Sequence, residues 1–132
     1  MDKFDPPRRG EIWWVLTPGR PDDPHQPRPA IVLSDDDRNQ TFQHVLVVPI
    51  YSRGTPGPTH VPLPAGIGGQ GGITRPSLAF CEEITTINRE FLDMDQGPAG
   101  RLVPERLLDE LVRGVRRAIG EIVVEPTDRG RP

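Results

Sequence analysis

The sequence of 132 residues contains one cysteine, one lysine and no long hydrophobic run. A single cysteine, Cys81, excludes an internal disulfide bond and any metal site built from several cysteines. No stretch reaches the roughly 18 apolar residues that a membrane-spanning helix needs. Residues 1–7 also lack the apolar segment of a secretory signal, so we expect a cytoplasmic protein that makes no membrane contact.

Aromatic residues are scarce as well, at 5%, and hydrophobic residues make up only 34%, so the core must be compact. The formal net charge of −3 argues against a protein that coats nucleic acid without specificity. A local basic groove remains possible, because nearly all basic residues are arginine, whose planar fork suits phosphate. A compositional bias toward arginine, proline and glycine explains the same excess equally well.

Proline and glycine are abundant, with 17 and 14 copies. They gather in two segments, 18–29 and 54–76, and leave clean apolar runs between them, which is typical of turns between strands rather than of disorder. We therefore predict a single domain over residues 1–124, followed by a polar tail, 125–132, that frays.

The apolar runs are rich in β-branched residues and predict short strands. These strands are expected at 11–17, 29–34, 44–51, 59–63, 77–81 and 84–87. Within 44–51, Pro49 implies an edge strand or a bulge, because proline donates no ladder hydrogen bond. Residues 35–39 predict a polar turn, and the glycine-rich segment 66–72 predicts a mobile loop.

The hydrophobic period changes over residues 104–122 and predicts an amphipathic helix with arginines beside its apolar stripe. The stripe consists of Leu108, Leu111, Val112, Val115, Ile119 and Ile122. The expected fold is mainly β with a C-terminal helix: a small antiparallel β-barrel against which the helix packs.

Four segments carry a family resemblance: RRGEIWWV at 8–15, RPAIVLSDD at 28–36, VLVVPIYS at 45–52 and CEEITTINREFL at 81–92. In this order and spacing they resemble the MazF/PemK (Kid-like) toxins of type II toxin–antitoxin systems, over roughly residues 8 to 120. The resemblance implies an SH3-like barrel (PemK/MazF/CcdB-like), a homodimer, and sequence-specific cleavage of single-stranded RNA without a metal or other cofactor. It also implies an antitoxin partner whose disordered acidic tail covers the RNA site, and DNA binding through the antitoxin complex.

The implied reaction uses the 2′-hydroxyl of the RNA as nucleophile and leaves a 2′,3′-cyclic phosphate. It needs a base, an acid and a cation for the developing charge. Arg28 matches the family's catalytic arginine and would hold phosphate oxygens, although a solvated arginine before a strand fits the sequence too. Glu82 lies where one branch of the family carries its base, and a structural carboxylate on the barrel rim fits this position equally well.

Two positions depart from the family pattern. Many members carry a catalytic threonine where this chain has Tyr51, and the next residue, Ser52, offers a hydroxyl one position late and so on the opposite face. Where one branch has an arginine that helps as acid, this chain has Phe80. His25 is the candidate acid, because it lies in the loop that borders the RNA site in this family. Surface loop histidines are, however, usually inert.

Arg53 and Arg75 would extend the basic groove around Arg28. Trp13 and Trp14 alternate across their strand, so one is expected in the core. The other, expected to be Trp14, faces either the groove, where it would stack a base, or the dimer interface. No spacing of histidines and carboxylates resembles a zinc site.

Two other functions fit the same fold. The departures at Tyr51 and Phe80 suggest a catalytically impaired member that binds RNA or antitoxin. The related CcdB toxins share the barrel and poison gyrase, but their helix residues have no match here. The RNA recognition sequence depends on the loops 18–27 and 53–75.

Overall fold

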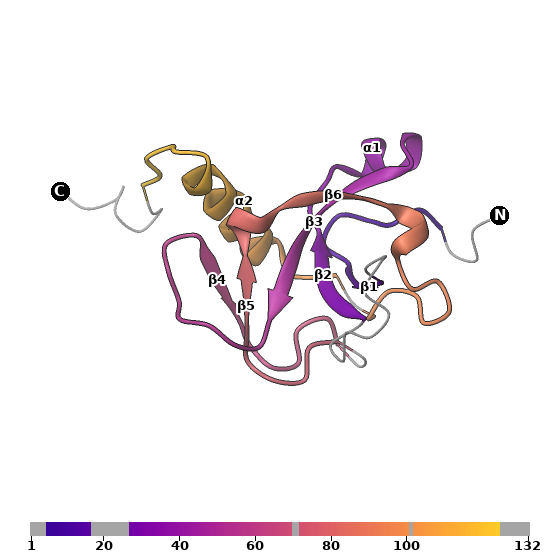
Figure 1. The fold of residues 1–132 in the computed structure, drawn as a ribbon, viewed down its shortest axis with the longest axis horizontal. Coiled ribbons are helices and arrows are strands. Elements are labelled where there is room, and N and C mark those ends of the chain that lie inside the picture. The colour runs from indigo at the N-terminus through magenta and orange to yellow at the C-terminus, as the bar shows by residue number, and fades with distance from the viewer. Residues whose placement is uncertain (1–4, 17–26, 70–71, 101, 125–132) are drawn as a thin grey trace.

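The computed structural model describes residues 5–16, 27–69, 72–100 and 102–124 (Figure 1). Within these ranges no helix is both long enough and apolar enough to cross a bilayer. The strands are β1 (Ile12–Val15), β2 (Arg28–Val32), β3 (His44–Tyr51), β4 (His60–Leu63), β5 (Ser77–Phe80) and β6 (Thr85–Asn88). The helices are α1 (Asp36–Thr41) and α2 (Glu105–Ala118), with two 3-10 turns, η1 (Cys81–Glu83) and η2 (Arg89–Phe91).

The six strands form one antiparallel sheet in the order β1-β2-β3-β5-β4, with β6 also paired to β3. Strand β3 is central: its first half pairs with β6 and its last two residues pair with β5. The predicted fold, mainly β with a C-terminal helix, is confirmed, and the predicted strands are all present with small shifts at their ends. The sheet is barrel-like but not closed, since no pairing among the described residues joins β1 to β4.

Pro49 lies on this central strand, so the predicted edge position is wrong. The predicted alternative, a bulge, is not seen in the pairing with β2, where Pro49 lies opposite Ala30 in an unbroken register. The carbonyl of Leu46 accepts a hydrogen bond from Leu33 N–H at 2.9 Å on the β2 side. Backbone groups alternate along a strand, so the nitrogen of Pro49 faces the opposite side. On that side the partner changes: the pairing of β3 with β6 stops at Val47, and its pairing with β5 starts at Ile50. Proline is tolerated because its missing donor falls in this gap.

The sheet carries apolar packing on both faces. One core cluster holds Ile12, Ile31 and Val48 together with Leu108 and Leu111 of α2. The other cluster lies on the opposite face and is centred on Trp13, which is 1% exposed. The prediction that one tryptophan enters the core is confirmed by Trp13.

Helix α2 packs against the turn η1 at a point of very close approach. A Cβ atom added to Gly114 would lie 2.6 Å from the Sγ atom of Cys81, a residue that is fully buried. Only glycine permits this contact in the middle of the helix. The contact fixes where η1 lies relative to the helix.

Two details of the predicted helix and turn are wrong. Helix α2 ends at Ala118, and Gly120 turns the chain at a φ of 99°. Ile119 and Ile122 are therefore 77% and 93% exposed instead of joining the buried stripe. Residues 36–41 form α1 rather than a polar turn, because the side chain of Asp35 caps the helix by accepting Asp37 N–H at 3.0 Å. The predicted tail, 125–132, lies outside the described residues.

Candidate functional site

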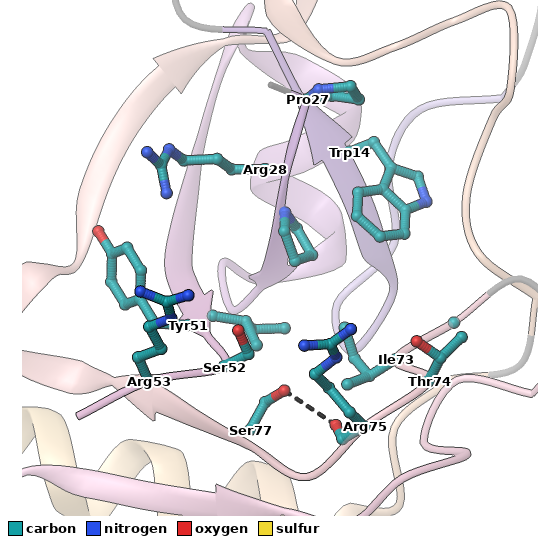
Figure 2. Close-up of a pocket in the computed structure, with 13 residues that line it drawn as sticks. Trp14, Pro27, Arg28, Tyr51, Ser52, Arg53, Ile73, Thr74, Arg75 and Ser77 are labelled. Carbon is teal, nitrogen blue, oxygen red and sulfur yellow. Dashed lines mark hydrogen bonds between the residues drawn. The ribbon is translucent and has the colours of Figure 1, made fainter. Parts of the chain in front are cut away.

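A pocket of about 560 Å³ opens where β2 begins and β3 ends (Figure 2). Its other walls come from Trp14 on β1 and from the segment 72–77. Among the described residues that line it, three are arginines and none is acidic. The lining therefore favours an anion such as phosphate.

Arg28 is the first residue of β2, where the chain enters the sheet opposite Val15. Its guanidinium carbon lies 6.0 Å from the centre of the Tyr51 ring. Arg28 and Tyr51 occupy the same side of the pocket, and Trp14 stands on the other (Figure 2). Arg28 and Tyr51, which were both predicted as catalytic residues, therefore lie next to each other in the pocket.

Tyr51 ends β3, and its hydroxyl donates to Oε1 of Glu83 at 2.7 Å. Burial, and then the hydrogen bond to Glu83, raise the pKa of Tyr51 to about 12. Because that value lies well above neutrality, the phenol keeps its proton in the free protein. Tyr51 is therefore a proton donor toward Glu83, with its oxygen lone pairs still able to accept.

The other predicted RNA-binding residues also line the pocket, and so does Ser52, which was predicted as a catalytic candidate. Ser52 and Arg53 follow Tyr51 and are exposed, and Arg75 stands near Ser77, whose Oγ donates to the carbonyl of Arg75 at 3.0 Å. Trp14 is half-buried and presents its ring to the cavity, as the strand alternation predicts (Figure 2). Ser52 lies beyond the end of β3, so strand alternation does not keep it out of the pocket.

Glu82 is not among the lining residues of this pocket. Its carboxylate meets Nε2 of His60 at 2.9 Å and accepts from Oγ1 of Thr59 at 3.0 Å. Burial acts to raise the pKa of Glu82, but hydrogen bonds from His60, from its own backbone and from Thr59 outweigh it, so the pKa is lowered. Glu82 is thus held charged against β4.

Sequence reasoning missed both Glu83 and His60. Glu83 lies 32 residues from Tyr51, and His60 lies 22 residues from Glu82. Contacts between residues so far apart in the sequence cannot be predicted from a local spacing pattern. The one available signal was the Glu82–Glu83 doublet, which offers two carboxylates at the position of a single expected base. His25, the candidate acid, lies outside the described residues.

Metal ligation has no obvious place in the part of the chain that the structure describes. There, no group of three or more histidine, cysteine or acidic residues is arranged to hold an ion. Cys81 is buried, and burial raises the pKa of its thiol to about 12. It is therefore an inert core residue rather than a nucleophile.

The pocket, the barrel-like sheet and the C-terminal helix agree with a family match. The sequence over residues 8–119 matches the model of the PemK-like, MazF-like toxin of type II toxin–antitoxin systems. The chain therefore belongs to the PemK/MazF toxin family. Comparison with the sequences of curated proteins gave no match.

Solved structures of this family share the fold. An endoribonuclease bound to its cognate antitoxin, from a mycobacterial species, is 17% identical, has a TM-score of 0.68, and aligns over 89% of this chain and 99% of its own. MazF in a MazE–MazF complex from Deinococcus radiodurans is 21% identical with a TM-score of 0.67, over 87% and 96% of the two chains. The toxin MazF-mt6 of Mycobacterium tuberculosis is 20% identical with a TM-score of 0.62, over 83% and 95%.

Proposed function

We propose that this protein is a metal-independent, sequence-specific endoribonuclease that cleaves single-stranded RNA as the toxin of a toxin–antitoxin pair. The observation that carries the proposal is the pocket, in which Arg28 stands beside Tyr51 and further arginines continue the lining. Family membership over residues 8–119 supports the same activity. The expected target is RNA in the cytoplasm.

In the proposed reaction the 2′-oxygen of one nucleotide attacks the adjacent phosphorus and the 5′-oxygen of the next nucleotide leaves. The products are a 2′,3′-cyclic phosphate and a 5′-hydroxyl. Arg28 would bind two phosphate oxygens and neutralise the charge that grows on them in the transition state. Tyr51 stands within reach of the same phosphate, since its ring lies beside the Arg28 guanidinium.

The outer parts of the pocket would hold the neighbouring nucleotides. Arg53 and Arg75 would bind backbone phosphates, Ser52 would hydrogen-bond one of them, and Trp14 would stack a base. The family resemblance alone would give the base to Glu82 and the acid to His25, but Glu82 is bound by His60 and Thr59 and is not among the lining residues of the pocket.

The proposed partners follow from the same surface. An antitoxin with an acidic, disordered tail would be attracted by the three arginines and would exclude RNA by occupying the pocket. The solved neighbours include a MazE–MazF complex and an endoribonuclease with its antitoxin. A homodimer is the expected active form, which light scattering on the purified protein would test.

The test is incubation of the purified protein with a long single-stranded RNA in EDTA, followed by mapping of the ends. Discrete cuts that leave 2′,3′-cyclic phosphates are expected. Arg28→Ala should reduce cleavage at least about a hundredfold, since removal of one charge-stabilising donor typically costs that much. Arg106→Ala, which changes an exposed arginine on α2 that does not line the pocket, is the matched control and should cut normally.

The alternative function, a binding module without catalysis, predicts a different outcome. A folded protein that binds RNA but cuts none of a wide panel of sequences would establish that alternative. The observation that favours this alternative is the presence of Tyr51 where many family members carry a catalytic threonine.

A further inference from the structure

The acidic doublet in η1 sends its two carboxylates to different partners. Glu83 accepts from the Tyr51 hydroxyl at 2.7 Å, and Tyr51 lines the pocket. Glu82 is taken up by His60 and Thr59. Within the described part of the chain, Glu83 alone of the two acids is connected to the pocket through a hydrogen bond.

The geometry of η1 explains the division. Successive residues of a 3-10 turn project about 120° apart, so neighbouring side chains diverge. Cys81, at the start of the turn, is buried against Gly114 of α2, which fixes the rotation of the turn. Glu82 then faces β4 and Glu83 faces the end of β3.

We propose that Tyr51 and Glu83 act as one proton-accepting pair that activates the 2′-hydroxyl of the bound RNA. The inference rests on the proposed function and names the base that the family resemblance had assigned to Glu82. The 2′-hydroxyl gives its proton to the Tyr51 oxygen while the Tyr51 proton moves to Glu83. The 2′-oxygen bonds to phosphorus, and the bond from phosphorus to the 5′-oxygen breaks.

The protons balance through solvent. The departing 5′-oxygen takes a proton from a water molecule, and the hydroxide that remains removes the proton from Glu83. Both side chains then return to their starting states. Arg28 meanwhile holds the phosphate oxygens and carries no proton in the cycle.

Neither side chain alone suffices for this role. Burial and the Glu83 hydrogen bond hold Tyr51 protonated, with a pKa of about 12, so tyrosinate is not available as a base. Glu83 is exposed and does not itself line the pocket, so it reaches the RNA through Tyr51. The hydrogen bond of 2.7 Å between them connects the two, because it gives the tyrosine proton an acceptor at the moment a second proton arrives.

The experiment compares Glu83→Gln and Tyr51→Phe with wild type on a short RNA that holds one cleavage site, under single-turnover conditions across a range of pH. Each variant should cleave about a hundredfold more slowly, as is typical when a general base is lost, and the double variant should be no slower than either. The acidic limb of the wild-type pH–rate profile should disappear in Glu83→Gln. Binding of an RNA with a 2′-deoxy nucleotide at the cleavage site should change less than about threefold.

Two further variants make the test specific. Glu90→Gln alters another exposed acid in a 3-10 turn, η2, and should cleave at the wild-type rate. Glu82→Gln should lose less than about tenfold. Glu83→Gln with wild-type cleavage, or Glu82→Gln with the larger loss, would overturn the pair. A wild-type protein that cuts no RNA would instead overturn the proposed function itself.

Discussion

Glu82 and Glu83 are neighbours in one turn, yet their surroundings differ in kind. Glu82 is bound by two side chains of the β4 region, His60 and Thr59, and its charge is satisfied within the protein. Glu83 has its hydrogen bond from a tyrosine on the pocket wall. In the proposed mechanism, the carboxylate that two side chains of the protein bind serves the fold, and the one linked to a pocket hydroxyl takes part in the chemistry.

His60 connects Glu82 to a second part of the protein. Its Nδ1 lies 3.1 Å from the carbonyl oxygen of Thr55 and its Nε2 lies 2.9 Å from Glu82. Both neighbours are acceptors, so only the doubly protonated ring makes both hydrogen bonds. These two contacts of His60, which we call the His60 clasp, connect the loop after β3 to β4 and η1.

Phe80 connects the two sides. Its ring stacks on His60 with centres 4.0 Å apart and meets Tyr51 edge-on at 4.7 Å. The Glu82 side and the Glu83 side of the turn therefore share one aromatic support, at the end of β5.

The largest expected effect comes from Gly114→Ala, which would push η1 away and disturb both sides of the turn. The new methyl group would collide with Sγ of Cys81 at 2.6 Å, and overpacking of this kind costs about 1–3 kcal/mol. Urea unfolding measures the loss. Helix propensity alone predicts the opposite, a gain of about 1 kcal/mol, which would contradict the account.

A double variant provides the control for that clash. Cys81→Ala removes the sulfur that the methyl group meets, although the Cβ atom of residue 81 stays 3.0 Å away. The two substitutions together should therefore destabilise less than the sum of their separate effects. If the two losses of stability add exactly, the strain caused by Gly114→Ala does not come from the contact with the sulfur of Cys81.

Phe80→Leu should have the next largest effect, because it removes both ring contacts while keeping an apolar side chain. A loss of about 1–2 kcal/mol in the free energy of unfolding is expected from two aromatic contacts. Cleavage should also slow, since Tyr51 loses the ring that orients it. A variant that is less stable but cuts at the wild-type rate would show that Tyr51 is positioned without Phe80.

The smallest expected effect is that of Glu82→Gln on stability, about 0.5 kcal/mol, because solvent screens a side chain that is 40% exposed. The pKa of Glu82 is lowered in the folded protein, so its contribution is present above the ordinary value and is lost as pH falls through the folded one. The difference between wild type and variant should be measurable by unfolding at about pH 6 and should shrink as the pH falls below the ordinary glutamate pKa of about 4.3. A difference that grew on acidification would contradict the His60 clasp.

The fold and the pocket were largely predictable from the sequence. Apolar β-branched runs bounded by proline and glycine located the strands, and the change of period located α2. Arg28 and Tyr51 were placed by motif, and the structure brings them together. Helix α1 was missed although Asp35, a common capping residue, stands directly before it.

The partners of the acidic doublet were not predictable. Which way Glu82 and Glu83 face depends on the rotation of η1, and this rotation is set by the contact of Cys81 with Gly114, 33 residues further along the chain. Sequence periodicity describes regular elements, and a three-residue turn is too short to have a period.

One measurement tests the proposed difference in role between Glu82 and Glu83 most directly: the cleavage rate and the free energy of unfolding, determined together for Glu82→Gln and Glu83→Gln. The account predicts that Glu83→Gln loses about a hundredfold in rate with stability within about 0.5 kcal/mol of wild type. Glu82→Gln should keep its rate within about tenfold and lose only about 0.5 kcal/mol of stability, so the two variants are separated by their cleavage rates, and the stabilities show that both are folded. Equal rates for wild type and Glu83→Gln, or a larger loss of rate in Glu82→Gln, would contradict it.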